Sequence, residues 1–140
     1  MALPQLIKEP RRAHSFKKIA PPYIEFRNVS FAYPGGPPIL KHVSFTIHPG
    51  ENVVLVGING AGKSTIIKLL CRFYDVTEGQ ILINGINLQQ LKLSNWYSHL
   101  GTLFQNFVQY NFTVRKNIML GAPNIRDQKR MHQAAVDSGA

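Results

Sequence analysis

The first half of the chain contains two segments in which apolar and polar residues alternate, a pattern typical of strands with one buried face. They cover residues 23–31 and 43–47. A proline- and glycine-rich loop, residues 33–38, separates them, and the turn-forming pair Pro49-Gly50 follows the second. The pattern predicts an early antiparallel β layer.

The pattern changes at residues 53–56, where Val-Val-Leu-Val forms an unbroken apolar run. Such a run is typical of a strand that is buried on both faces. A glycine-rich loop, residues 57–62, follows it. Residues 64–72 contain no helix breaker and place apolar side chains at positions 66, 67, 69 and 70, which predicts a helix. The expected order is therefore strand, glycine loop, helix.

The remaining segments predict shorter elements and a leader without regular structure. A strand closed by Asn84-Gly85 is expected over residues 79–85, because Asn-Gly favours a tight hairpin turn. Further elements are expected as follows: a helix over 91–97, a strand over 100–104, a helix over 111–120 that starts near Thr113, and a helix over 127–138 with Asp127 near its N-terminus. Four prolines in residues 1–22 predict an irregular linker.

Composition places the chain among globular proteins, because 44% of its 140 residues are hydrophobic, enough for one modest domain. Its net charge of +9 raises the alternatives of a nucleic-acid surface or an anionic membrane. The first 20 residues hold one acid, Glu9, and five bases: Lys8, Arg11, Arg12, Lys17 and Lys18. A basic arm on a less biased body fits this distribution. No aromatic-interleaved basic motif is present, so no nucleic acid is expected as a partner.

The single cysteine, Cys71, excludes an internal disulfide. Its place in an apolar run predicts a small buried side chain rather than a reactive thiol. No apolar stretch reaches the roughly 18 residues that a membrane span needs. The histidines have no metal-ligand spacing, so they are interpreted as surface or internally satisfied side chains.

Residues 57–65, Gly-Ile-Asn-Gly-Ala-Gly-Lys-Ser-Thr, fit the pattern G-x-x-x-x-G-K-[ST] of a phosphate-binding loop. Glycines let backbone N–H groups converge on an anion, and the N-terminus of the following helix favours negative charge. Lys63 would supply positive charge to the β- and γ-phosphate oxygens, and the Ser64 hydroxyl would bind Mg²⁺. The predicted ligands are ATP and Mg²⁺. The alternative, an ordinary glycine-rich turn with an exposed lysine, is disfavoured by the flanking strand and helix.

Together with its neighbours, this loop resembles the ATP-binding domain of an ABC transporter, from about Tyr23 to the end of the chain. The resemblance is carried by the segments IEFRNVSFAYPG, PILKHVSFTIHPGENVVLVGINGAGKSTIIKLL, DVTEGQILINGINL, LGTLFQNF, FTVRKNIMLG and HQAAVDSGA. It implies an α/β fold of the P-loop NTPase class and the ABC type. The chain would be its N-terminal half, an antiparallel β layer plus a partial RecA-like core.

The resemblance also implies the domain boundaries. Residues 1–22 would be a basic, proline-containing linker, like the one that follows the fused membrane domain of exporter-type members. Residues 23–140 would be a partial ATP-binding domain, with a helical subdomain that begins near residue 127 and is cut off. The partners that it implies are a second ATP-binding domain and a transmembrane transport domain, at the cytoplasmic face of the membrane in the intact parent.

Site residues follow from the same resemblance. Tyr33 would stack on adenine, and Gln105 occupies the glutamine position of the Q-loop, where its amide would contact Mg²⁺ or orient water. From the residues alone, Tyr33 is more often a turn aromatic and Gln105 more often a polar residue at a strand edge. Lys63 and Gln105 are the candidate catalytic residues, and Ser64 and Gln105 the candidate metal ligands. The nucleotide-binding candidates are Tyr33, Gly57, Asn59, Gly60, Ala61, Gly62, Lys63, Ser64 and Thr65.

The sequence departs from the family at the residues that hydrolysis needs. The family uses Asp-Glu after four apolar residues, a Leu-Ser-Gly-Gly-Gln signature and a later histidine, and none of these patterns is present. The seven acids are isolated, and none follows an apolar quartet: Glu9, Glu25, Glu51, Asp75, Glu78, Asp127 and Asp137. We therefore expect a truncated domain that binds ATP but does not hydrolyse it alone. A P-loop kinase and a non-transport nucleotide-binding module are the alternatives.

Overall fold

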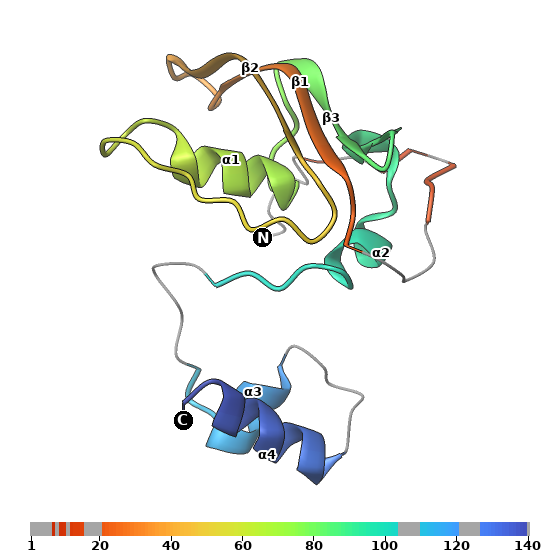
Figure 1. Ribbon diagram of the computed structural model, residues 1–140, viewed down its shortest axis with the longest axis vertical. Helices are drawn as coiled ribbons and strands as arrows, with labels where there is room; N and C mark the ends of the chain where they lie inside the picture. Colours follow the sequence, from red (N-terminus) through yellow and green to blue (C-terminus); the bar gives the residue numbers. More distant parts are fainter. Residues whose placement is uncertain are drawn as a thin grey trace. The chain divides into compact units, whose positions relative to one another are not determined.

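The computed structural model describes residues 7, 9–10, 12–15, 21–103, 110–120 and 127–139. The chain divides into two compact units, Met1–Gly101 and Thr102–Ala140 (Figure 1). The first unit contains the strands, the glycine loop and helices α1 and α2, and the described part of the second contains helices α3 and α4. Each unit is described separately.

A four-stranded antiparallel sheet forms the frame of the first unit. Its strands are β1 (Ile24–Ala32), β2 (Pro38–Ile47), β3 (Glu78–Ile83) and β4 (Ile86–Asn87), in the order β2-β1-β3-β4. Strand β1 is central, because its Ile24 pairs with Ile47 of β2 on one edge and with Ile83 of β3 on the other. The predicted antiparallel layer is confirmed, although β2 begins at Pro38 rather than at Val43.

A tight turn at Asn84-Gly85 joins β3 to β4. Both residues adopt positive φ, 50° and 80°, which are the values of a type I′ turn. This turn type matches the twist of antiparallel strands, and Asn tolerates the left-handed region better than most residues that carry a Cβ. The Asn84 side-chain oxygen also accepts a 2.8 Å hydrogen bond from the Tyr23 N–H. The turn predicted from the Asn-Gly pair is confirmed.

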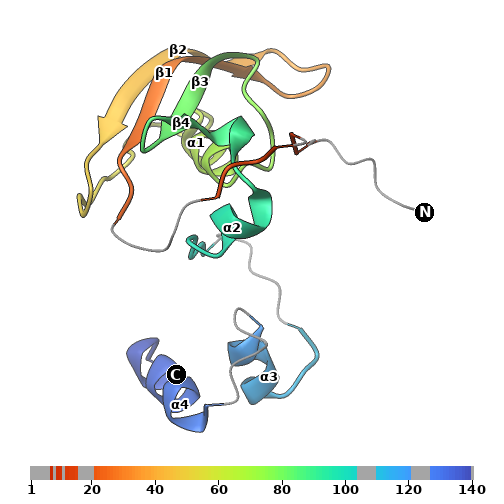
Figure 2. The ribbon, with the colours of Figure 1, turned by 90° about the vertical axis from the view of Figure 1, so that its right-hand side faces the viewer.

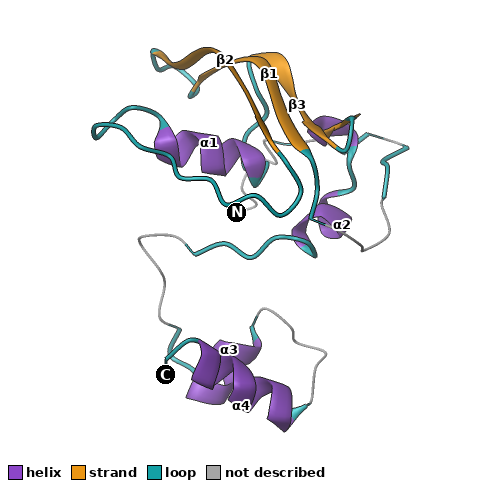
Figure 3. Cartoon of the chain, viewed as in Figure 1, coloured by secondary structure: helices purple, strands orange, loops and turns teal. Residues whose placement is uncertain are grey.

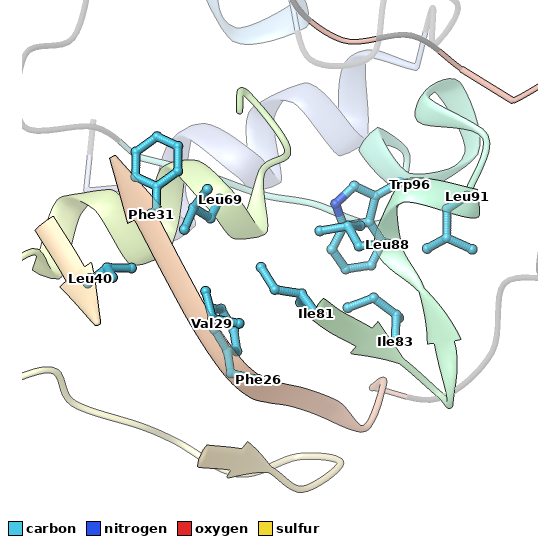
Figure 4. Close-up of a cluster of buried hydrophobic side chains, with 10 residues drawn as sticks. All are labelled: Phe26, Val29, Phe31, Leu40, Leu69, Ile81, Ile83, Leu88, Leu91 and Trp96. Carbon is cyan, nitrogen blue, oxygen red and sulfur yellow. The ribbon is translucent and has the colours of Figure 1, made fainter. Parts of the chain in front are cut away.

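Helix α1 (Lys63–Leu70) lies on one face of the sheet (Figure 2). Leu69 points from the helix into a core that the sheet and the following segment complete, and Cys71 at the helix end is buried as predicted. Figure 4 shows the members of this core: Phe26, Val29, Phe31, Leu40, Leu69, Ile81, Ile83, Leu88, Leu91 and Trp96. Each fully buried large apolar side chain contributes about 1.5–3 kcal/mol. Packing of this core fixes α1, and with it the glycine loop at its N-terminus.

The chain after β4 packs against the C-terminal end of α1. It forms a short 3₁₀ helix, η1 (Leu88–Gln90), and then α2 (Leu93–Tyr97), which confirms the helix predicted over 91–97. The indole Nε1 of Trp96 in α2 donates a 2.9 Å hydrogen bond to the Leu70 carbonyl, one of the last carbonyls of α1. Arg72, 1% exposed, donates a 3.1 Å hydrogen bond to the Leu91 carbonyl. The Trp96 bond satisfies a carbonyl that the end of α1 leaves open, and the Arg72 bond ties the segment after α1 to the chain before α2.

Two predicted strands are wrong. Residues 51–58 form no strand (Figure 3), and Val54 and Val56 are 80% and 89% exposed. A strand buried on both faces needs hydrogen-bonded neighbours at its edges, and no strand in the described ranges pairs with this run. The strand predicted over 100–104 is absent at residues 100–103, and Phe104 lies outside the described residues.

The second unit contains α3 (Val114–Met119) and α4 (Gln128–Asp137), where the sequence predicts helices. Thr113 caps α3, because its hydroxyl accepts a hydrogen bond from the Lys116 N–H at 3.3 Å. Asp127 caps α4 in the same way, with a 2.9 Å bond from the Lys129 N–H. Both capping residues match the predicted helix starts. Within the described parts of both units, no helix is long and apolar enough to cross a membrane.

The leader, which belongs to the first unit, bonds to the segment around α2 through two of its described residues. The His14 backbone N–H donates to the Gln90 carbonyl at 2.7 Å, and the His14 carbonyl accepts from the Lys92 N–H at 2.8 Å. The Glu9 carboxylate accepts a 2.6 Å hydrogen bond from the N–H of Leu93, the first residue of α2. Lys92, at the N-cap position, makes no capping bond with its own side chain. Glu9 therefore supplies the cap from a distant part of the sequence, which sequence patterns did not predict.

We expect Glu9→Ala to lower the free energy of unfolding by about 1 kcal/mol, the usual cost of losing a helix cap. Glu9→Gln is the matched control, because its amide oxygen still accepts from the Leu93 N–H, and it should lose less. Urea unfolding followed by Trp96 fluorescence measures both variants. Equal stability of the two variants would contradict a capping role for Glu9.

Candidate functional site

The glycine loop leads directly into α1, as the phosphate-loop pattern predicts. Helix α1 begins at Lys63, and its N-cap residue is Gly62, whose φ of 89° lies in the left-handed region. A Cβ at Gly62 would lie 2.7 Å from Cδ2 of Leu40 on β2, closer than carbon atoms pack. Glycine is therefore required here both by the backbone conformation and by the close approach of β2.

Lys63 folds back over the loop that precedes it. Its Nζ donates hydrogen bonds of 2.7 Å to the carbonyls of Gly57 and of Ile58. A second loop contact is backbone to backbone, from the Ala61 N–H to the Ile58 carbonyl at 3.2 Å. These bonds tie the start of the loop to the start of α1 through the ammonium group of Lys63.

The N-terminus of α1 carries positive charge, which destabilises a helix at this end. A helix dipole places partial positive charge at this end, where acidic side chains stabilise and cations destabilise. The first turn of α1 has no acidic residue, no side chain caps it, and its first residue is Lys63. The first N–H groups of a helix have no acceptor inside the helix. An anion bound at this end would satisfy the N–H groups and offset the Lys63 charge.

Ser64 and Thr65 differ in their exposure. Ser64 is exposed at the start of α1, where its hydroxyl is open to a metal ion, whereas Thr65 is only 6% exposed. Asn59, Gly60 and Ala61 are exposed along the loop. In the described residues, no group of three or more His, Cys, Asp or Glu side chains could hold a metal ion. Because Mg²⁺ is usually bound by one or two protein ligands together with phosphate oxygens and water, a single hydroxyl here fits Mg²⁺ only together with a phosphate ligand.

Tyr33, which lies in the loop between β1 and β2, reaches α1. Its hydroxyl is 3.4 Å from Oγ1 of Thr65, although the two residues are 32 positions apart in the sequence. The ring is half-buried and perpendicular to the rings of Phe31 and Tyr74, with centroid distances of 5.0 Å to each. The structure thus brings Tyr33 and the phosphate loop's helix together, as a shared site requires. Gln105, the remaining site residue expected from the sequence, lies outside the described residues.

Lys68 also contacts Tyr33, and the sequence patterns did not predict that it belongs to this site. Its Nζ donates a hydrogen bond of 3.3 Å to the Tyr33 hydroxyl. The spacing could have predicted this contact, because Lys68 follows Thr65 by three positions and therefore lies on the same face of α1. Tyr74, just beyond α1, was missed as well, since nothing in its sequence context distinguishes it from a core aromatic.

Comparison with known proteins supports one family. A family model described as ABC transporter matches residues 40–139. The chain is 40% identical over 132 residues to a subtilin transport ATP-binding protein of Bacillus subtilis, covering 92% of this chain and 22% of that protein. It is 41% identical over 117 residues to an ATP-dependent lipid A-core flippase of Saccharophagus degradans, covering 84% of this chain and 20% of that protein.

A solved structure agrees with these relatives. It is a bacterial Atm1-family ABC exporter with ATP bound, matched with a TM-score of 0.88 at 34% identity. The match covers 95% of this chain and 23% of that chain. The chain therefore spans less than a quarter of the length of these relatives, and the likeness concerns one part of each.

We expect Gly62→Ala to destabilise the protein more than Gly60→Ala. Both glycines have positive φ, 89° and 86°, which costs an L-residue about 1–2 kcal/mol, but a Cβ at Gly60 meets nothing within 4 Å. Only the Gly62 variant must also displace Leu40. Urea unfolding of both variants measures the difference, and a Gly62→Ala variant no less stable than Gly60→Ala would refute the close approach of β2.

Proposed function

This chain belongs to the ABC transporter family, and we propose that residues 57–65 bind the triphosphate of ATP together with Mg²⁺. The observation that carries this proposal is the charge at the start of α1. Lys63 stands at the positive end of the helix, no acid follows it in the first turn, and the loop before it closes around its ammonium group. Such an arrangement is stabilised by a bound polyanion.

Each described site residue has a role that its chemistry supports. The N–H groups of Gly60 and Gly62 would donate to phosphate oxygens. The Ala61 N–H would do so on leaving the Ile58 carbonyl, and Lys63 would exchange its loop carbonyls for the β- and γ-phosphates. The exposed Ser64 hydroxyl would bind Mg²⁺ alongside phosphate oxygens. The bound ion would neutralise the charge of the phosphates.

Tyr33 would place its ring against the adenine base. In support of this role, the Tyr33 hydroxyl contacts Thr65 of the same helix that begins at the phosphate loop. Stacking on an aromatic ring is worth on the order of 1 kcal/mol beyond the burial of its area. Gln105 would act beside Mg²⁺ or a water molecule; this role is carried by the sequence resemblance alone.

The intact parent would be an exporter-type transporter that couples ATP binding and hydrolysis to transport across a membrane. The names of the relatives support this proposal, since they include a flippase and an exporter with ATP bound. The parent would pair this domain with a second ATP-binding domain and with a transmembrane domain, at the cytoplasmic face of the membrane. Within this chain, residues 23–140 would belong to the ATP-binding domain and residues 1–22 to the linker, anchored through Glu9 and His14.

ATP hydrolysis needs a carboxylate near Mg²⁺, and no acid of this chain stands at the sequence position that the family uses for it. A phosphoryl-transfer site needs an acid near Mg²⁺ and a group that positions the attacking water. None of the seven acids follows the apolar quartet that the family uses, and none lies in the first turn of α1. We therefore propose that the 140-residue chain alone binds ATP without turning it over.

Lys63→Ala should abolish ATP binding, because the site loses its charge to the β- and γ-phosphates. Isothermal titration of the chain with Mg²⁺-ATP measures this. Lys92→Ala is the matched control, because Lys92 is an exposed lysine at the N-cap of α2 that bonds through its backbone, and it should bind like the wild type. Unchanged affinity of Lys63→Ala would rule out the phosphate-loop assignment.

The isolated chain should release no phosphate from Mg²⁺-ATP above the buffer background. A coupled phosphate-release assay at saturating nucleotide tests this. Turnover that Lys63→Ala removes would overturn the proposal, because it would require a catalytic carboxylate among the seven acids.

A further inference from the structure

We propose that Lys68 is a positioning residue of the nucleotide site, which holds the hydroxyl of Tyr33 and thereby fixes the ring that faces the base. This inference rests on the proposed function, because it needs Tyr33 to contact adenine. It adds a residue that the phosphate-loop pattern does not contain. Lys68 lies on α1 one turn beyond the loop, and its role acts through Tyr33 rather than through the phosphates.

The hydrogen-bond directions at Tyr33 follow from the chemistry of its two partners. An ammonium group can only donate, so the Tyr33 oxygen accepts from Lys68 Nζ at 3.3 Å. The Tyr33 hydroxyl also lies 3.4 Å from Oγ1 of Thr65, and the cation at its oxygen favours Tyr33 as the donor of that bond. The Thr65 hydroxyl proton is left to point away from Tyr33. Lys68, Tyr33 and Thr65 therefore form a chain of hydrogen bonds that holds the Tyr33 hydroxyl between two side chains of α1.

Distances place the ammonium of Lys68 at the hydroxyl end of the ring. Its Nζ is 5.4 Å from the ring centroid but 3.3 Å from the hydroxyl oxygen. A cation centred over the ring would be closer to the centroid than to the oxygen, so Lys68 lies toward the hydroxyl end of the ring rather than over its centre. It restrains the ring by its tip.

Two other aromatic residues pack against the ring and restrain it. Phe31 and Tyr74 stand at 82° and 85° to the Tyr33 ring, at 5.0 Å between centroids. Phe31 is 3% exposed and belongs to the core, so one neighbour of Tyr33 cannot move freely. With its hydroxyl bonded to α1 and its ring packed against Phe31 and Tyr74, Tyr33 keeps a set direction relative to the phosphate loop. The groups proposed to contact the base and the phosphates are then all held by α1.

The consequence is a selective effect on base recognition. Lys68→Met keeps the length and apolar stem of the side chain but removes the donor, so the ring loses its restraint at the tip. We expect its affinity for Mg²⁺-ATP to fall by about five- to tenfold, the size of one net hydrogen bond. Affinity for Mg²⁺-tripolyphosphate, which has no base, should stay within about twofold, a difference below that of one hydrogen bond.

The experiment is isothermal titration of the full chain with both ligands, using the wild type, Lys68→Met, Tyr33→Phe and the double variant. Tyr33→Phe keeps the ring and removes the hydroxyl, so the double variant should bind ATP no more weakly than the weaker single variant. Lys68→Arg keeps a cationic donor and should recover most of the ATP affinity. Lys41→Met is the matched control. Side chains alternate along a strand, so Lys41, which follows the buried Leu40 on β2, points away from the core and is exposed.

The outcomes separate this inference from the proposed function. If Lys68→Met weakens both ligands equally, or weakens neither, the positioning role is overturned while the phosphate site stands. Additive losses in the double variant would overturn it too, because residues in one chain of hydrogen bonds should not act independently. If the wild type binds neither ligand, the proposed function fails, and this inference fails with it.

Discussion

The packing of α1 against the inner face of the antiparallel sheet is the interaction on which the site depends. Leu69 anchors the helix in the core, and Gly62 lets its N-terminus approach β2 as closely as the side chain of Leu40 permits. At the other end, Trp96 and Arg72 bond to carbonyls at the C-terminus of α1 and in the segment before α2. A helix held at both ends presents its N-terminal N–H groups in a fixed direction, which is what binding an anion without reorganisation requires.

The residues along α1 differ in their proposed roles. The first turn has Lys63 and Ser64, the proposed phosphate and metal ligands, and no acid that would compete for the lysine. The same helix has Thr65 and Lys68 on the side that meets Tyr33. In the proposed site, a single short helix would therefore connect the two ends of a nucleotide, the phosphates and the base.

Local sequence patterns correctly predicted the features whose conformation depends on a few neighbouring residues. The glycine loop, the Asn84-Gly85 turn and the capping residues Thr113 and Asp127 all lie where the sequence predicts them, because each depends on a few neighbouring residues. The run at 53–56 was predicted wrongly because the conformation of a buried strand depends on neighbouring strands, which a local apolar pattern cannot supply. The contact of Glu9 with α2 and that of Lys68 with Tyr33 were missed for a related reason. Each joins residues distant in sequence, and only the packing of α1 and α2 brings them together.

The most direct test of the central claim is to follow the backbone amides by NMR while Mg²⁺-ATP is added to the chain. If α1 presents a phosphate site, the largest shifts should fall on the N–H groups of Gly60, Gly62, Lys63 and Ser64, with smaller shifts near Tyr33. Tripolyphosphate should reproduce the shifts of the loop but not those near Tyr33. Saturating nucleotide that leaves the loop amides unmoved, or moves only residues elsewhere, would contradict the account.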